Sequence, residues 1–233
     1  MSHILRIAAG FLLVLCWQGG AVAADAHSHG NPEQIEVNRL QLDLDVDFED
    51  RQLRGSVLLA FRRHDPSADV LRLDSKDLVI AAVEQRIGGA WRPARWELGS
   101  ADPVHGAELA VHLEPGADQV SIHYATDPGA SGLQWLEPTQ TAGKSPFLST
   151  QAQAIHARSF IPLQDSPAVR VTYSARVRVP RGMRAVMSAA NDPAAQADGV
   201  FEFDMPQPIP TYLIALAVGE LEFRAIGERT GVY

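Results

Sequence analysis

The polar run between Thr150 and Pro167 holds the residue types in this sequence that are best suited to chemistry. Its letters, TQAQAIHARSFIPLQDSP, place Gln151, Gln153, His156 and Arg158 within eight residues of one another. A carboxamide offers an acceptor and two donors, so a glutamine at the edge of a cleft can accept from an ammonium group or hold a peptide backbone. A carboxamide is neither an acid nor a base, and the run is therefore a candidate for binding.

The same run has a structural alternative. In that interpretation Gln151 and Gln153 satisfy backbone groups at a strand edge and in a loop, and Arg158 pairs with a nearby acid such as Asp165. Taken alone, the residue types favour this structural alternative over a site.

Other catalytic signatures do not occur in the sequence. It has no H-E-x-x-H and no pair of cysteines for a zinc site, no G-x-S-x-G for a serine hydrolase, and no G-x-G-x-x-G or P-loop pattern for a nucleotide. The polar run is therefore the best candidate by elimination.

Eight histidines invite a metal-binding interpretation. His112 and His123 lie in alternating segments, which favours side chains that face solvent over metal ligands. The triplet Asp25-Ala26-His27 offers another alternative. Cleavage after Ala24 would leave a free amine two residues before an imidazole, a planar nitrogen set suited to Cu(II) or Ni(II). Cleavage after Ala23 would move the amine out of register.

The elements that position these residues are predicted to be β-strands. Apolar and polar residues alternate from Ile35 to Phe48, and again in LRGSVLLAF after a short break, which predicts an antiparallel hairpin. Gly88-Gly89 predicts a tight turn with positive φ at both positions. The clearest alternation runs from Val169 to Val179. Prolines precede TYLIALAVGELEF near the C-terminal end, which favours a buried strand there over a helix.

Short strands at intervals near ten residues, with no convincing helical period between them, predict the fold class. We expect an all-β, multi-sheet antiparallel β-sandwich. The length of 233 residues, with 46% hydrophobic residues, suits one large all-β domain or two small ones. Twenty Lys and Arg stand against 28 Asp and Glu, a net charge of −8 with no basic run, so nucleic acid is not an expected partner.

The N-terminal residues 1–24 are predicted to be a signal peptide, followed by a flexible leader over residues 25–34. The apolar stretch from Ala8 to Trp17 is shorter than the ~20 residues of a membrane span, and no later segment supplies one. A lipid anchor at Cys16 is disfavoured because bulky Leu15 precedes it. We therefore expect an exported protein, periplasmic or secreted, whose mature form has no disulfide.

Several segments together resemble a known family. SGLQWLEPTQTAGKSPFLSTQAQAIHARSFIPLQDSPAVRVTYSARVRVP closely resembles the N-terminal domain of zinc aminopeptidases in the leukotriene hydrolase and aminopeptidase B branch. VNRLQLDLDVDFEDRQLRGSVLLAF and LRLDSKDLVI fit the opening strands of that domain, and IPTYLIALAVGELEFRAIGERTGVY is similar to its end. The resemblance is most specific where GLQW, Q-x-Q-A-I-H-x-R and P-x-Q-D-x-P follow in register.

The resemblance implies a saddle-like β domain over residues 35–227 that packs on a thermolysin-like zinc domain, with residues 228–233 starting the junction. It implies that Gln153 binds the free α-amine of a peptide, and that Gln151 and the backbone at Ala152 line the pocket for the first side chain. His156 and Arg158 also match the family pattern, and we expect them to support the run from behind it.

The resemblance also implies a cofactor that this sequence does not hold. The H-E-x-x-H zinc ligands of the family are absent here. We therefore expect zinc in a longer parent protein, no metal bound by this chain and no hydrolysis by this chain alone. The parent would act on peptide N-termini. The alternative hypothesis is a free-standing secreted β-sandwich module that binds peptides or proteins without catalysis.

Overall fold

The computed structural model describes residues 25–141, 144–194 and 198–233. The signal peptide predicted at 1–24 lies outside these residues. The strands in chain order are β1 (Ile35–Asp47), β2 (Gln52–Arg63), β3 (Val70–Ser75), β4 (Val79–Ile87), β5 (Ala90–Pro93), β6 (Arg95–Leu98), β7 (Ala107–His112), β8 (Ala117–Ala125), β9 (Leu133–Leu136), β10 (Phe147–Thr150), β11 (Arg170–Arg178), β12 (Arg184–Met187), β13 (Val200–Pro210), β14 (Leu216–Gly219), β15 (Arg224–Gly227) and β16 (Thr230–Val232). Three short 3-10 turns are η1 (Pro138–Gln140), η2 (Ala157–Ser159) and η3 (Thr211–Leu213).

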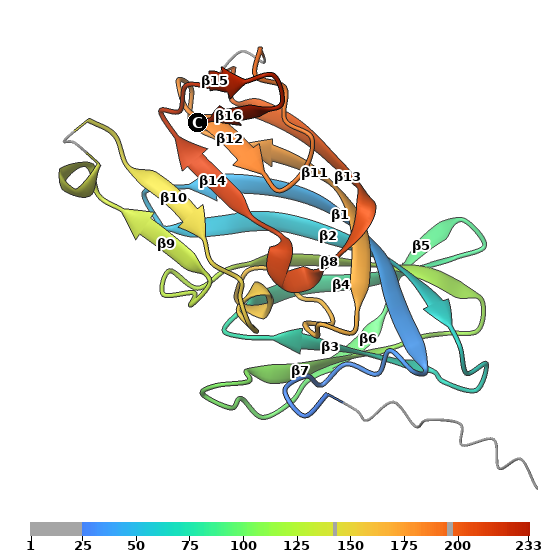
Figure 1. The fold of residues 1–233 in the computed structure, drawn as a ribbon. Helices are drawn as coiled ribbons and strands as arrows, with labels where there is room; N and C mark the ends of the chain where they lie inside the picture. Colours follow the sequence, from blue (N-terminus) through green and yellow to red (C-terminus); the bar gives the residue numbers. More distant parts are fainter. Residues whose placement is uncertain (1–24, 142–143, 195–197) are drawn as a thin grey trace, which may run out of the picture.

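A large twisted sheet forms the middle of the molecule (Figure 1). Its strand order is β13-β11-β1-β2-β8-β4-β5. The predicted hairpin is confirmed, since β1 and β2 pair antiparallel with Leu42 opposite Val57. The alternation along β1 places Leu40, Leu42 and Leu44 in the core. The pair β1 and β11 is parallel, which local patterns did not predict.

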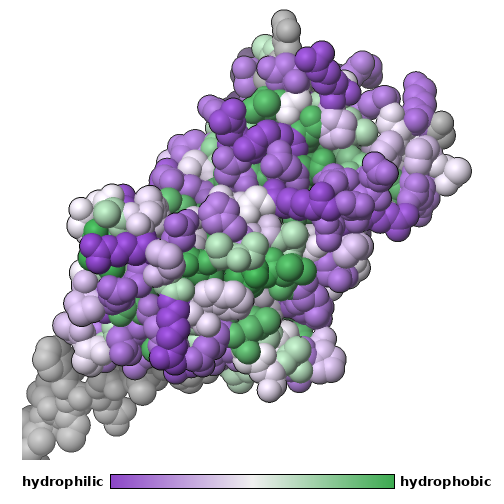
Figure 2. Space-filling view, turned by 180° about the vertical axis from the view of Figure 1, so that it is seen from behind, coloured by the Kyte–Doolittle hydropathy of each residue, from purple (hydrophilic) through white to green (hydrophobic). Residues whose placement is uncertain are grey.

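Smaller sheets pack around this one. A three-stranded sheet has the order β3-β7-β6, a four-stranded sheet has the order β12-β14-β10-β9, and β15 pairs with β16 near the C-terminus (Figure 1). Buried side chains of the large sheet, the three-stranded sheet and the four-stranded sheet belong to one hydrophobic cluster, to which β15 and β16 contribute none. The predicted all-β sandwich-type fold is confirmed. The face seen from behind is mostly hydrophilic, with hydrophobic side chains gathered in its middle (Figure 2).

The glycine turn and the alternating strand near residue 170 behave as predicted. Gly88 and Gly89 have φ of 57° and 84° between β4 and β5. Val171, Tyr173 and Val177 of β11 are buried. The arginine face of β11 is only partly solvated, because Arg178 forms ion pairs with Asp43 and Asp45 of β1.

The prediction of a single buried strand over TYLIALAVGELEF is wrong in the extent of that strand. Thr211–Leu213 form η3, and only Leu216–Gly219 form a strand, β14. Leu216 and Val218 are buried, whereas Leu213 is 49% exposed. The segment is apolar nearly throughout, so composition did not reveal where the chain turns.

The leader, residues 25–34, was expected to be flexible. In the structure it lies against β3 and makes specific hydrogen bonds. Asn31 Nδ2 donates to the carbonyl of Val70 at 2.9 Å, and the amide of Arg72 donates to Asn31 Oδ1 at 3.1 Å. Ser28 Oγ donates to Asp74 Oδ2 at 2.6 Å. No helix within the residues that the structure describes is long and apolar enough to cross a membrane.

The close approach of β2 to β1 at Gly55 gives a test of the central hairpin. Gly55 has φ of 151°, and a Cβ there would lie 1.9 Å from the carbonyl oxygen of Asp43. We expect Gly55→Ala to lower the free energy of unfolding by about 2–4 kcal/mol, because both the conformation and the contact are unfavourable for alanine. Urea unfolding of the chain measures this.

Gly99→Ala is the matched control, since its Cβ would meet nothing nearer than 3.5 Å. It should change the free energy of unfolding by less than about 0.5 kcal/mol. Equal effects of the two substitutions would contradict the structural role of Gly55.

Candidate functional site

The polar run forms a loop, residues 151–166, that connects β10 to the stretch before β11; we call it the site loop. Its first residues run beside the start of β9. The amide of Gln151 donates to the carbonyl of Gly132 at 2.9 Å. A Cβ on Gly132 would lie 2.6 Å from the carbonyl oxygen of His156. Glycine at position 132 therefore allows the two backbones to approach closely.

The glutamine run alternates between exposed and buried side chains. Gln151 and Gln153 are exposed, and Ala152 between them is 3% exposed. Gln151 Oε1 accepts from the amide of Gln153 at 3.2 Å, so this carboxamide also has the backbone role of the structural alternative. The Gln153 side chain has no hydrogen bond to any part of the chain that the structure describes. The Gln153–Ala154 peptide bond is cis.

His156 is half-buried behind the glutamines. Its Nδ1 lies 3.0 Å from Ser131 Oγ, and its amide donates to the carbonyl of Ala152 at 2.9 Å. Ser159 Oγ donates to the carbonyl of His156 at 2.7 Å and accepts from the amide of Gly132 at 2.8 Å. These bonds close the turn that carries Gln151 and Gln153.

Arg158 is fully buried and paired, as the structural alternative predicted. Its Nε donates to Asp165 Oδ2 at 3.2 Å, and Nη2 donates to the carbonyl of Asp165 at 2.9 Å. Nη1 donates to the carbonyl of His105 at 2.9 Å and lies 3.5 Å from Asp74 Oδ1. A buried guanidinium needs this degree of pairing, because desolvating an unpaired charge is very unfavourable.

Asp74 and Asp165 complete the set, which we call the buried ion network: Arg158, Asp74 and Asp165. The amide of Asp165 donates to Asp74 Oδ2 at 2.8 Å, and Thr211 Oγ1 donates to Asp165 Oδ1 at 2.9 Å. Burial raises the pKa of the Asp165 carboxyl, and the Arg158 guanidinium and the Thr211 hydroxyl oppose that shift. The network joins the site loop to β3 and η3.

Gln164 fixes the far end of the site loop, a role that sequence reasoning did not assign. Its Oε1 accepts from the amide of Val37 at 3.0 Å, and its Nε2 donates to the carbonyl of Ile35 at 2.8 Å. Tyr124 OH donates to the carbonyl of Phe160 at 2.9 Å. The P-x-Q-D-x-P pattern contains Gln164 and Asp165, but this local pattern does not predict their partners on β1 and β3.

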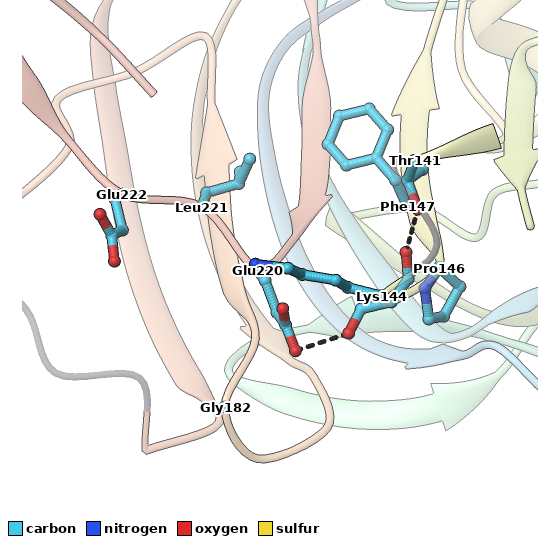
Figure 3. A pocket seen from close by; sticks show the side chains of 9 residues that line it. Thr141, Lys144, Pro146, Phe147, Gly182, Glu220, Leu221 and Glu222 are labelled. Carbon is cyan, nitrogen blue, oxygen red and sulfur yellow. Dashed lines mark hydrogen bonds between the residues drawn. The ribbon is translucent and has the colours of Figure 1, made fainter. Parts of the chain in front are cut away.

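A separate hollow of about 670 Å³ lies at the other end of β10 (Figure 3). Ser145 Oγ donates to Glu220 Oε1 at 2.5 Å, and Thr141 Oγ1 bonds the Ser145 carbonyl. Lys144 and Phe147 line it as well. None of the predicted site residues lines this hollow.

The described residues contain no group of three or more His, Cys, Asp and Glu side chains arranged to hold a metal ion. They therefore do not fit a zinc centre of the family type. His112 is half-buried with its Nε2 3.6 Å from Glu97, and His123 is exposed with its Nε2 3.8 Å from Glu84.

The buried ion network should govern the stability of the site loop. Arg158→Met keeps an unbranched side chain but removes the guanidinium charge, which leaves two buried carboxylates without a counter-ion. We expect the free energy of unfolding to fall by about 3–5 kcal/mol. Arg176→Met on the exposed face of β11 is the control and should change it by less than about 0.5 kcal/mol.

Thr211→Val gives a milder test if Arg158→Met does not fold, because it removes one bond to Asp165. It should lower the free energy of unfolding by about 1–2 kcal/mol. If Arg158→Met and Thr211→Val are both as stable as the unmodified chain in urea titrations, the network is not needed for stability.

Comparison with known proteins shows which family this chain is similar to. The peptidase M1 N-terminal domain family matches residues 32–213. Leukotriene A-4 hydrolase of Xenopus laevis is 39% identical over 221 residues, which cover 90% of this chain and 36% of that protein. Leucine aminopeptidase 2 of Eremothecium gossypii is 33% identical over 216 residues, 91% of this chain and 34% of that protein. The chain thus spans about a third of the length of these relatives.

Solved structures agree with the sequence matches. Yeast leukotriene A4 hydrolase in complex with bestatin superposes on 91% of this chain and 33% of its own, with a TM-score of 0.81 and 28% identity. An M1 zinc metallopeptidase of Deinococcus radiodurans bound to a Tyr-Ser-Ala substrate gives a TM-score of 0.64 at 25% identity over 84% of this chain and 44% of its own. The resemblance is confirmed, and the chain belongs to the peptidase M1 N-terminal domain family.

Proposed function

We propose that this chain is the substrate-recognition part of an exported zinc aminopeptidase, which removes residues from the N-termini of peptides. The observation that carries the proposal is the glutamine run. Gln151 and Gln153 are exposed on a loop whose later residues, 157–166, are all buried. A site that binds a charged group works best when its polar atoms are held in place before the ligand arrives.

In this proposal Gln153 accepts a hydrogen bond from the free α-ammonium group of the peptide. Gln151 and the backbone at Ala152 line the pocket for the first side chain. A blocked N-terminus would leave polar atoms of the site without partners, so the site selects peptides with a free amine. His156 and Arg158 do not touch substrate; they hold the turn through Ser131 and the buried ion network.

The hydrolytic step belongs to a separate zinc domain of the longer protein, because the described residues of this chain do not fit a zinc site. The C-terminal hairpin supports packing on such a domain. All residues of β15 and β16 are exposed, and Ile226 and Val232 are 66% and 50% exposed. A two-stranded hairpin with exposed apolar residues gains stability when another domain covers it.

Export and the domain limits are part of the same proposal. The signal peptide at 1–24 directs the protein to the periplasm or the exterior, the recognition domain covers 35–227, and 228–233 start the junction with the zinc domain.

Reading the genomic DNA past the Tyr233 codon tests whether a zinc aminopeptidase domain is encoded there. A downstream H-E-x-x-H is expected, and its absence both in frame and after a frameshift would refute the aminopeptidase.

Gln153→Ala tests the role of this chain within the enzyme that contains the zinc domain. We expect KM for peptides to rise and kcat/KM to fall by an amount equivalent to about 1–3 kcal/mol, because the ammonium group loses a hydrogen-bond acceptor. The zinc content should not change. Hydrolysis of aminoacyl anilides, followed by absorbance, measures the kinetics.

Gln207→Ala is the matched control, because Gln207 is exposed on β13 outside the site loop. It should leave KM and kcat unchanged. If Gln153→Ala behaves like this control, Gln153 is not in the substrate site.

A further inference from the structure

Two histidines from distant parts of the chain meet at the surface. His27 lies in the leader, and His105 lies in the loop between β6 and β7. His27 Nδ1 is 3.3 Å from His105 Nε2, and the two rings are inclined by 23°. Both rings reach solvent, since His27 is exposed and the His105 side chain is 34% exposed.

The loop that carries His105 is fixed by its own contacts. Asp102 Oδ1 accepts from the amides of Val104 and His105 at 2.8 and 2.7 Å, and Gly106 turns the chain with φ of 76°. Arg158 of the buried ion network binds the carbonyl of His105 at 2.9 Å. Hydrogen bonds therefore hold both the amide and the carbonyl group of His105.

The leader holds His27 by an equivalent set of bonds. Asp25 Oδ1 accepts from the amide of His27 at 3.0 Å, and Ser166 Oγ donates to Asp25 Oδ2 at 2.7 Å. Ser28 Oγ donates to Asp74 of the buried ion network. The same network therefore anchors the two backbone segments that carry the rings.

The ring nitrogens that face each other are His27 Nδ1 and His105 Nε2. His105 Nδ1 lies 3.2 Å from Asp102 Oδ1. An ionised carboxylate only accepts, so this contact favours the tautomer of a neutral His105 ring with the hydrogen on Nδ1 and the lone pair on Nε2. A carboxylate behind an imidazole is also the usual support of a metal-ligating histidine. In that tautomer His105 Nε2 can accept a hydrogen bond from His27 Nδ1–H across the 3.3 Å between them.

The spacing of the two nitrogens also suits a metal ion. Nitrogens bound at ~2.0–2.1 Å to one ion, at angles from square to tetrahedral, lie roughly 2.9–3.4 Å apart. The observed 3.3 Å falls within that range. Imidazole suits late first-row metals, of which Cu(II) binds most tightly at a given site.

We propose that His27 and His105 form a transition-metal site that prefers Cu(II), with Asp102 positioning the His105 ring. On binding, the proton of His27 Nδ1 moves to Nε2, so both facing nitrogens donate lone pairs to the ion. Water fills the remaining positions. The carboxylates of Asp25 and Asp102 place negative charge beside the cation. This site does not depend on the peptide-binding role of the glutamine run.

Copper titration of the full chain carrying His3→Ala, with its uncleaved N-terminus verified by mass spectrometry, tests the proposal, because Met1-Ser2-His3 would itself offer a planar set of amine, amide and imidazole nitrogens. Uncleaved chain has no free amine at Asp25, so the planar set expected for a cleaved Asp25-Ala26-His27 cannot form. We expect one Cu(II) per chain, with hyperfine coupling to two imidazole nitrogens in electron paramagnetic resonance. His27→Ala and His105→Ala should each abolish this signal.

The controls separate ligand loss from unfolding. His123→Ala, an exposed histidine on β8, should bind copper like the unmodified chain. Asp102→Asn should weaken binding by about 10–100-fold, the usual effect of removing such a support. Circular dichroism should show all four variants folded. Copper binding that survives His105→Ala, or the absence of any one-to-one binding, would overturn the proposal.

Discussion

The buried ion network of Arg158, Asp74 and Asp165 is the interaction on which the functional surface of this protein depends. A guanidinium with no solvent exposure is tolerated only where carboxylates and carbonyls surround it. Here those groups come from β3, from the loop at His105 and from the end of the site loop. Burying Arg158 without these partners would be very unfavourable. A fold that buries Arg158 must therefore bring the three segments together.

The site loop is fixed at its base and open at its surface. Ala157, Arg158, Ser159 and the following residues to Ser166 are buried, whereas Gln151 and Gln153 remain exposed. Gln164 ties the loop to β1 of the large sheet, and Gly132 lets the loop approach β9. The loop lacks long strands, yet these bonds hold its backbone in place. That combination suits a site that must recognise a small charged group.

The leader and the site loop share the same support. Asp74 accepts from Ser28 and His29 of the leader and from the amide of Asp165. The glutamine run and the histidine pair are thus attached to one network by different segments. The positions of these two surface features are not independent, because the segments that carry them contain or bond to residues of the same network.

The sequence by itself determined most of the strands, because alternation of apolar and polar residues is a local property of a half-buried strand. It determined the β1–β2 hairpin and the turn at Gly88-Gly89 for the same reason. It also predicted the pairing of Arg158 with Asp165, which lie seven residues apart. The apolar segment after Pro210 was predicted less well, since uniform hydrophobicity does not show where η3 ends and β14 begins.

Only the tertiary structure decided which distant residues meet. The parallel pairing of β1 with β11, the addition of Asp74 to the Arg158–Asp165 pair and the contact of His27 with His105 all join residues more than 75 positions apart. No local pattern encodes such pairs, because their partners are selected by the packing of whole sheets. The sequence marked the glutamine run as polar and unusual. The fold then decided that its arginine would be buried as a support and its glutamines left exposed, since burial depends on what the rest of the chain places around them.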